Sequence, residues 1–268
     1  MKIAQLVDFL ESIAPSSLQE SYDNAGLITG QHSWECTGVL TTLDCIEEVV
    51  DEAISKKCNL IVAHHPIVFS GLKKINGKNY VERTIIKAIK NDIAIYAIHT
   101  NLDNVLNGVN GVIADKLNLS NRSVLLPRQV EPEFVVKGIS ELGAGLVGEL
   151  PEAVDEQVFL RDLKAIFGVP SIRHTTLLGR KIKKVAVCGG AGSFMIFNAL
   201  EAKADIFITA DMKYHQFFDA DGKMVLADIG HFETEQFTTE FLQAEIAKKF
   251  PNFAVLKTAV NTNPVCYF

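Results

Sequence analysis

The stretch NLIVAHHP, residues 59–66, contains a short apolar run that ends in two adjacent histidines and a proline. The apolar run is continuous rather than alternating, which is typical of a strand buried on both faces of a parallel sheet. Pro66 cannot donate to a strand ladder, so the strand is predicted to end near His64 and His65. Both imidazoles should therefore lie where a strand leaves its sheet.

Strand and helix patterns alternate on both sides of this stretch. Apolar strand patterns occur at residues 38–45, 59–66 and 93–104. Each is followed by helical spacing, at residues 46–58, 81–92 and 107–118. Because strands separated by helices pair in parallel through right-handed crossovers, the sequence predicts an α/β fold with a parallel sheet.

A second lobe is predicted near the middle of the chain. The periodicity weakens between residues 120 and 180, where prolines and glycines interrupt it. A β-α-β pattern returns at 183–211, followed by a strand at 224–231, a helix at 232–250 and a final strand at 252–259. We therefore predict a first α/β lobe from residues 1–126 and 222–268, and a second α/β lobe from residues 127–221.

Composition and charge exclude several classes of partner. The 268 residues carry a formal net charge of −6, which argues against a nucleic-acid-binding surface. No apolar stretch approaches the roughly 18–20 residues of a membrane span, and the N-terminal apolar pattern contains Asp8 and Glu11, unlike a signal peptide. The five cysteines form no CxxC pair, which is typical of reduced thiols, so we expect a cytoplasmic protein.

Histidines and carboxylates follow several of the predicted strands. They are His64, His65, His99, Asp103, His231 and Glu235. Because the carboxyl ends of parallel strands meet at one edge of a sheet, we expect these side chains to converge there. Taken singly, each is more easily explained as a surface, core or capping residue. Together, imidazole and carboxylate donors suit Zn, Fe, Mn, Ni or Co, and Asp103 and Glu235 could bridge two such ions.

Two further places carry weaker signals. Backbone N–H groups of a glycine-rich turn after the strand pattern at 183 could bind a phosphate, although a tight strand-to-helix turn requires the same glycines. The residues concerned are Gly189, Gly190, Gly192 and Ser193. Asp211 and His215, spaced i, i+4, could form a polar pair with an acid–base role or simply cap a helix.

Six motifs together resemble the Nif-three-like family, whose members are known as GTP cyclohydrolase I type-two homologues. They are SYDNAGL (21–27), AHHPIVF (63–69), HTNLDN (99–104), VAVCGGAGS (185–193), ITADMKYHQ (208–216) and GHFETE (230–235). The motifs occur in the family's order and extend from the first helix to the last strand. This chain departs from the usual pattern at Tyr22, where many members have tryptophan, and at Ala210, where glycine is usual.

The resemblance implies two interlinked α/β domains with mostly parallel sheets and a dinuclear metal centre in each subunit. Carried over motif by motif, the ligands would be His64, His65, Asp103, His231 and Glu235. His99 would lie beside the centre, orienting a ligand or occasionally binding metal. The family assembles as a toroidal homohexamer, a trimer of dimers, with its sites facing the interior. Because residues 120–180 are too few for the extra domain of some members, the compact form is expected.

Two functions of different classes are compatible with these residues. The first is a metal-dependent hydrolase acting on a small substrate, with phosphorylated compounds and nucleotides among the candidates. In that case His99 and His215 would transfer a proton, because an unperturbed imidazole titrates near neutral pH, and the glycine turn would hold a substrate phosphate. The alternative is a metal storage or delivery protein, which uses similar ligands but needs no open coordination position.

Overall fold

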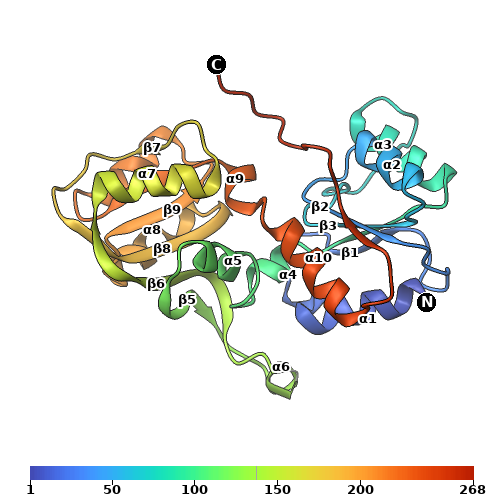
Figure 1. Ribbon diagram of the computed structural model, residues 1–268, viewed down its shortest axis with the longest axis horizontal. Helices are drawn as coiled ribbons and strands as arrows, with labels where there is room; N and C mark the ends of the chain where they lie inside the picture. Colours follow the sequence, from blue (N-terminus) through green and yellow to red (C-terminus); the bar gives the residue numbers. More distant parts are fainter. Residues whose placement is uncertain (137) are drawn as a thin grey trace. The chain divides into compact units, whose positions relative to one another are not determined.

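The computed structural model describes residues 1–136 and 138–268, and its internal contacts divide the chain into two compact units. Unit 1 comprises Met1–Leu102 and Thr238–Cys266, and unit 2 comprises Asp103–Phe237 and Tyr267–Phe268. Each unit combines a sheet with helices, as the predicted α/β class requires (Figure 1). Unit 2 extends further than the predicted second lobe, because β5 (Ser120–Arg128) and β10 (Val225–Asp228) pair with strands of its sheet.

The sheet of unit 1 has the parallel arrangement predicted around residues 59–66. Its strands are, in spatial order, β1 (Gly26–Thr29), β4 (Ala94–Ala97), β3 (Leu60–Ala63), β2 (Val39–Thr42) and β11 (Val255–Lys257). The strands β4, β3, β2 and β11 pair in parallel, whereas β1 runs antiparallel to β4. Because β2, β3 and β4 are buried along their whole length, their sequences lack the alternation of a half-exposed strand.

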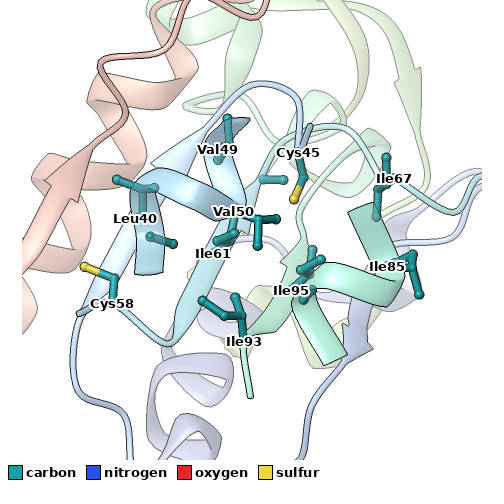
Figure 2. Packing of buried hydrophobic residues seen from close by; sticks show 13 residues of the cluster. Leu40, Cys45, Val49, Val50, Cys58, Ile61, Ile67, Ile85, Ile93 and Ile95 are labelled. Carbon is teal, nitrogen blue, oxygen red and sulfur yellow. The ribbon is translucent and has the colours of Figure 1, made fainter. Parts of the chain in front are cut away.

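Helices cover both faces of this sheet. The helices α2 (Glu47–Ser55) and α3 (Tyr80–Lys90) lie on one face, and α1 (Ile3–Ile13) and α10 (Thr238–Lys249) lie on the other (Figure 1). Figure 2 shows the core beneath the first pair, where Ile61 and Ile95 of the strands pack with Val50 of α2 and Ile85 of α3. This apolar packing fixes the ends of β3 and β4, and therefore the polar residues that follow them.

The sheet of unit 2 is mixed. Its spatial order is β5, β6 (Leu142–Asp155), β8 (Lys181–Ala191), β9 (Ile206–Ala210), β10 and β7 (Arg173–His174). The strands β8, β9 and β10 pair in parallel, whereas β5–β6, β6–β8 and β10–β7 are antiparallel pairs. The mostly parallel character expected for both sheets therefore holds in unit 1 and not in unit 2. The antiparallel strands β5 and β6 lie in the segment whose glycines and prolines concealed their pattern.

Apart from α7, the described helices of unit 2 are short. They are α5 (Val109–Lys116), α6 (Pro132–Val136), α7 (Glu156–Phe167), α8 (Ile196–Glu201) and α9 (His231–Glu235), with 3₁₀ turns η2 (Ser193–Met195) and η3 (Tyr214–Ala220). In unit 1, η1 (Ser16–Leu18) is another such turn, and the four-residue helix α4 (Thr100–Asp103) contains the boundary between the units. The single helix predicted over residues 232–250 is instead divided into α9 and α10, which belong to different units.

Two observations bear on the expected cellular setting. Within the described ranges, no helix is both long and apolar enough to cross a bilayer. Among the same residues the cysteines form no disulfide, and four of the five are buried. The cytoplasmic location stays a prediction.

Glu82, in the first turn of α3, orders the loop that precedes that helix. Its buried carboxylate accepts hydrogen bonds from the backbone amides of Asn76 and Lys78, and these bonds lower its pKa. A lowered folded-state pKa stabilises the fold above the unfolded value, near 4.5, and this contribution is lost as the pH falls. We therefore expect Glu82→Gln to lower the Tm clearly at pH 7 and much less at pH 3.

Calorimetry of the wild type and the variant at both pH values measures this difference. Glu152→Gln, which changes an exposed carboxylate in β6, is the matched control and should leave the Tm nearly unchanged at either pH. An equal loss of Tm for Glu82→Gln at pH 3 and pH 7 would contradict the electrostatic explanation.

Candidate metal centre

Three histidines gather at the carboxyl ends of two neighbouring strands of unit 1. His64 and His65 follow the last residue of β3, and His99 lies two residues after β4 and directly before α4. One ring nitrogen from each lies within 4.8 Å of the others. The ring centroids are 4.9–5.4 Å apart. We call these three residues the histidine cluster.

Each ring of the histidine cluster is oriented through its Nδ1 atom. The Nδ1 atoms lie 2.8 Å from an acceptor oxygen in every case: the Ile98 carbonyl for His64, Asp44 Oδ1 for His65 and Asp23 Oδ1 for His99. A carbonyl or carboxylate oxygen can only accept, so each Nδ1 carries the proton. A metal ion would then be coordinated through Nε2, as in many metal-binding histidines.

Asp23 is held ionised beside His99. Its side chain is fully buried, and burial alone would raise its pKa. Hydrogen bonds from His99 and Thr100 outweigh that effect and hold the pKa of Asp23 well below its usual range. The negative charge of Asp23 therefore faces the His99 ring at neutral pH and stabilises the proton on Nδ1.

A second set of donors lies in unit 2. His231 and Glu235 are spaced i, i+4 on α9, and His231 Nε2 lies 3.1 Å from Glu235 Oε2. On its other side, His231 Nδ1 donates to Asp211 Oδ2 at 2.7 Å. One carboxylate oxygen of Asp103 and one of Glu235 lie within 4.8 Å of each other. We call Asp103, His231 and Glu235 the carboxylate cluster.

The pKa of the Cys188 thiol is affected by the charges of the carboxylate cluster. Burial raises the pKa of Cys188 well above its usual value, and the nearby charges of Asp103 and Glu235 raise it further. Two carboxylates that both act on one buried thiol concentrate negative charge in a small region of unit 2. A multiply charged cation would offset that repulsion, which is the electrostatic condition for a metal site.

The glycines after β8 make room for the carboxylate cluster. Gly190 has φ +61° at an irregularity in the pairing of β8 with β9, and a Cβ added there would lie 2.5 Å from Glu235 Oε1. The amides of Gly189, Gly190 and Gly192 already donate to side-chain oxygens of Asn110, Thr234 and Thr209, respectively. Ser193 Oγ accepts from Gln216. Because these groups already bond to side chains of the protein, their arrangement favours a packing role for the turn. Phosphate binding there stays a prediction.

Two sequence expectations change with the structure. The ligands do not all follow strands of one sheet, because β10, which precedes His231, pairs within the sheet of unit 2. Asp211 does not pair with His215, because its left-handed backbone directs it to His231 instead. His215 is exposed on η3, where its ring lies against Tyr214 and Phe218, and its acid–base role stays a prediction.

The sequence reasoning missed the residues that orient the histidines. Asp44 comes two residues after β2, so the strand-end rule that selected the histidines would also have selected it. Asp23 lies in the first of the six motifs, but only the fold brings it to His99, 76 residues away. Asp211 was identified as a polar residue, but its partner could not be read from sequence spacing.

Comparison with known proteins identifies the family. A family model described as Duf34/NIF3 (NGG1p interacting factor 3) matches residues 1–264. The chain belongs to the NIF3 family. The match includes every residue of the histidine and carboxylate clusters, and it agrees with the resemblance based on the six motifs.

NIF3 relatives of this chain are named as homologues of a cyclohydrolase. A Clostridium acetobutylicum protein, "GTP cyclohydrolase 1 type 2 homolog", is 35% identical over 236 residues, or 88% of this chain and 85% of the relative. A Staphylococcus epidermidis protein of the same name is 28% identical, and the match covers all of both chains. That alignment spans 366 positions, so the relative has residues that this 268-residue NIF3 chain lacks, as expected for the compact form.

Solved structures of NIF3 proteins share the fold. A hypothetical protein from Staphylococcus aureus is 34% identical with a TM-score of 0.91, and a Bacillus cereus protein related to NIF3 is 26% identical with a TM-score of 0.92. Each match covers 100% of this chain and 99% of the other. Neither description states a reaction, so the chemistry has to be argued from the two clusters.

Proposed function

We propose that this NIF3 protein binds two divalent metal ions and uses them to hydrolyse a small substrate. The proposed ligands are His64, His65, Asp103, His231 and Glu235, with Zn, Fe, Mn, Ni or Co as the candidate metals. One observation carries the proposal: every histidine of both clusters has its Nδ1 bonded to a protein oxygen, so coordination would use Nε2, and in His231 that atom lies 3.1 Å from the proposed ligand Glu235. The exposed His174 also has its Nδ1 bonded to a carbonyl, so the arrangement counts here because it recurs in all four histidines of the two clusters.

The donor set also suits hydrolysis. When bound, two ions would supply Lewis-acid activation of water and of the substrate. Asp103 and Glu235 offer carboxylate oxygens within 4.8 Å of each other, and carboxylates are groups that can bridge two ions. His99, whose Nδ1 proton is held by Asp23, has its Nε2 available to accept a proton or to bind metal. The names of the curated relatives, homologues of a GTP cyclohydrolase, favour a hydrolytic reaction and make GTP one substrate to test.

Metal content combined with a substrate panel tests the proposal. The protein is purified without chelator or affinity metal, its ions are counted, and it is assayed with phosphoesters, nucleotides including GTP, and cyclic amidines. We expect about two ions per chain and turnover that disappears in Asp103→Ala. Two ions without turnover, but with transfer to an acceptor chelator, would support storage or delivery instead. Absence of bound metal after reconstitution with each candidate ion would overturn both functions.

Asp44 provides a sharper test of the arrangement around His65. Loss of a carboxylate that orients a metal-binding histidine typically reduces metal affinity about 10–100-fold. We expect Asp44→Ala to weaken binding of one ion by that factor, measured by competition with a chromogenic chelator. Asp51→Ala is the control, because this exposed carboxylate on α2 pairs with Lys87 and no histidine. Equal affinities for Asp44→Ala and the wild type would contradict the assigned role.

The expected homohexamer is also a proposal for this chain, and an exposed aromatic surface in unit 2 supports it. Phe194, Phe197, Tyr214 and Phe218 expose 62–71% of their surface on η2, α8 and η3. Aromatic side chains gathered on a surface are typical of protein–protein contacts. Light scattering should give a mass of about six times the 29.4 kDa chain, and Phe197→Glu should lower it. A monomeric wild type would contradict the assembly.

A further inference from the structure

The segment after β11, residues 258–264, belongs to unit 1, and two of its threonine hydroxyls bond to carboxylates of that unit. Thr258 Oγ1 donates to the carboxylate of Glu52 on α2. Further along, Thr262 is 8% exposed, and its hydroxyl donates to Asp44 Oδ2 at 2.8 Å. The first contact anchors the segment on a helix of unit 1, and the second brings a buried hydroxyl onto a carboxylate that already bonds a histidine.

Thr262 is the far end of a hydrogen-bonded series that leads to His65. Asp44 uses Oδ2 for Thr262 and Oδ1 for His65 Nδ1, and both bonds are 2.8 Å long. A carboxylate held at both oxygens cannot rotate about its Cβ–Cγ bond without breaking one of these bonds. The threonine hydroxyl therefore fixes the plane of the acceptor that directs the His65 ring.

The residues of this hydrogen-bonded series line a cavity of about 460 Å³ in unit 1. Its walls include His65, Asp44 and Thr262, together with Asn261 and Asn263 on either side of the threonine. The terminal segment thus forms part of the wall around a candidate metal ligand. A change at Thr262 can reach His65 through Asp44, with no need for any contact between the threonine and the metal.

We propose that Thr262 is a positioning residue for the metal centre, acting through Asp44 on the Nε2 direction of His65. The inference rests on the proposed function, since it assumes that His65 binds metal. Direct orienting partners of ligands typically contribute 10–100-fold to affinity, so a residue one bond further away should contribute about 3–10-fold. A purely structural threonine would affect stability and leave the ring of His65 unchanged.

The test uses four variants of the whole chain: Thr262→Val, which removes the hydroxyl at constant shape, Thr262→Ser, which keeps it, Asp44→Ala, and the double variant Asp44→Ala with Thr262→Val. Cobalt(II) affinity is measured by titration, together with the visible spectrum of the bound ion. In the metal-free protein, ¹⁵N NMR of the His65 ring reports which nitrogen carries the proton.

We expect Thr262→Val to weaken cobalt binding about 3–10-fold and to shift both the visible spectrum and the His65 ring signals. Thr262→Ser should restore all three. In the Asp44→Ala background, Thr262→Val should have no further effect, because the series is already broken. Unchanged affinity and ring signals in Thr262→Val, or an equal effect with and without Asp44, would overturn the inference.

The same data separate this inference from the proposed function. If the wild type binds no cobalt, the proposed function fails, and the proposed action on metal binding fails with it. The ring signals then still decide whether Thr262 orients His65 through Asp44. If the wild type binds cobalt and Thr262→Val behaves like it in every measurement, the inference about Thr262 alone fails.

Discussion

Replacing His64 by alanine should remove one of the two expected metal ions from the protein. His64 is fully buried, and its Nδ1 donates to the Ile98 carbonyl, so its Nε2 points in one direction. Removing a ligand outright should cost more than removing an orienting partner, which typically reduces affinity 10–100-fold. We therefore expect at least about a 100-fold loss of affinity for one ion, measured by elemental analysis after dialysis and by chelator competition.

Stability has to be measured in parallel, because the variant also leaves the Ile98 carbonyl without its donor. An unsatisfied buried acceptor costs about 1–3 kcal/mol, so the metal-free variant should unfold at lower denaturant concentration and remain cooperative. His174→Ala is the matched control, since His174 also bonds a backbone carbonyl through Nδ1 but lies exposed on β7, outside both clusters. A His64→Ala protein that keeps two ions would show that the ligand assignment is wrong.

Gly190→Ala should damage both stability and metal binding, although position 190 contributes no side chain. A residue with a Cβ at φ +61° costs about 1–2 kcal/mol in backbone strain. The new methyl group would also lie 2.5 Å from Glu235 Oε1 and 3.1 Å from His231 Cε1, so both proposed ligands must move. We expect lower stability than strain alone explains, and at least about a 10-fold loss of metal affinity.

Gly168→Ala separates the two effects. Gly168 ends α7 at φ +65°, where an added Cβ meets no atom within 4 Å. That variant should lose only the strain energy of about 1–2 kcal/mol and bind metal like the wild type. Chemical denaturation and metal titration of both variants measure the difference. Equal metal affinities for the two alanine variants would contradict a steric role for Gly190.

The fold of unit 1 follows from local patterns, and that of unit 2 does so only in part. Continuous apolar runs and the helical spacing after them are sufficient to predict β3, β4 and the helices between them, since each pattern reports burial directly. The strands β5 and β6 contain glycines and prolines, and they are stabilised by pairing with each other across a long turn. Such pairing depends on contacts distant in sequence, which no local pattern records.

The candidate site shows the same division. His64 and His65 could be predicted because they follow a strand directly, and His231 and Glu235 because their spacing suits one turn of helix. The orienting residues could not be assigned, because Asp23 and Asp44 reach their histidines through the tertiary fold. For Gly190 the glycine pattern left two alternatives open, a tight turn or a phosphate site, and the structure shows that side chains of the protein itself, Glu235 and His231, lie where a Cβ would project.

The pairing of β11 with β2 affects the order in which the protein can fold during its synthesis on the ribosome. Val255 lies opposite Val39, so β2 remains an open sheet edge until the residues of β11 have been synthesised. At about 5–20 residues per second, the nascent chain waits roughly 10–40 s for that strand. The hydrogen bond from Thr262 to Asp44 forms even later, because the two residues are 218 positions apart in sequence. Most of unit 2 can therefore fold while unit 1 is still incomplete, and the surroundings of His65 are complete only after Thr262 has been synthesised.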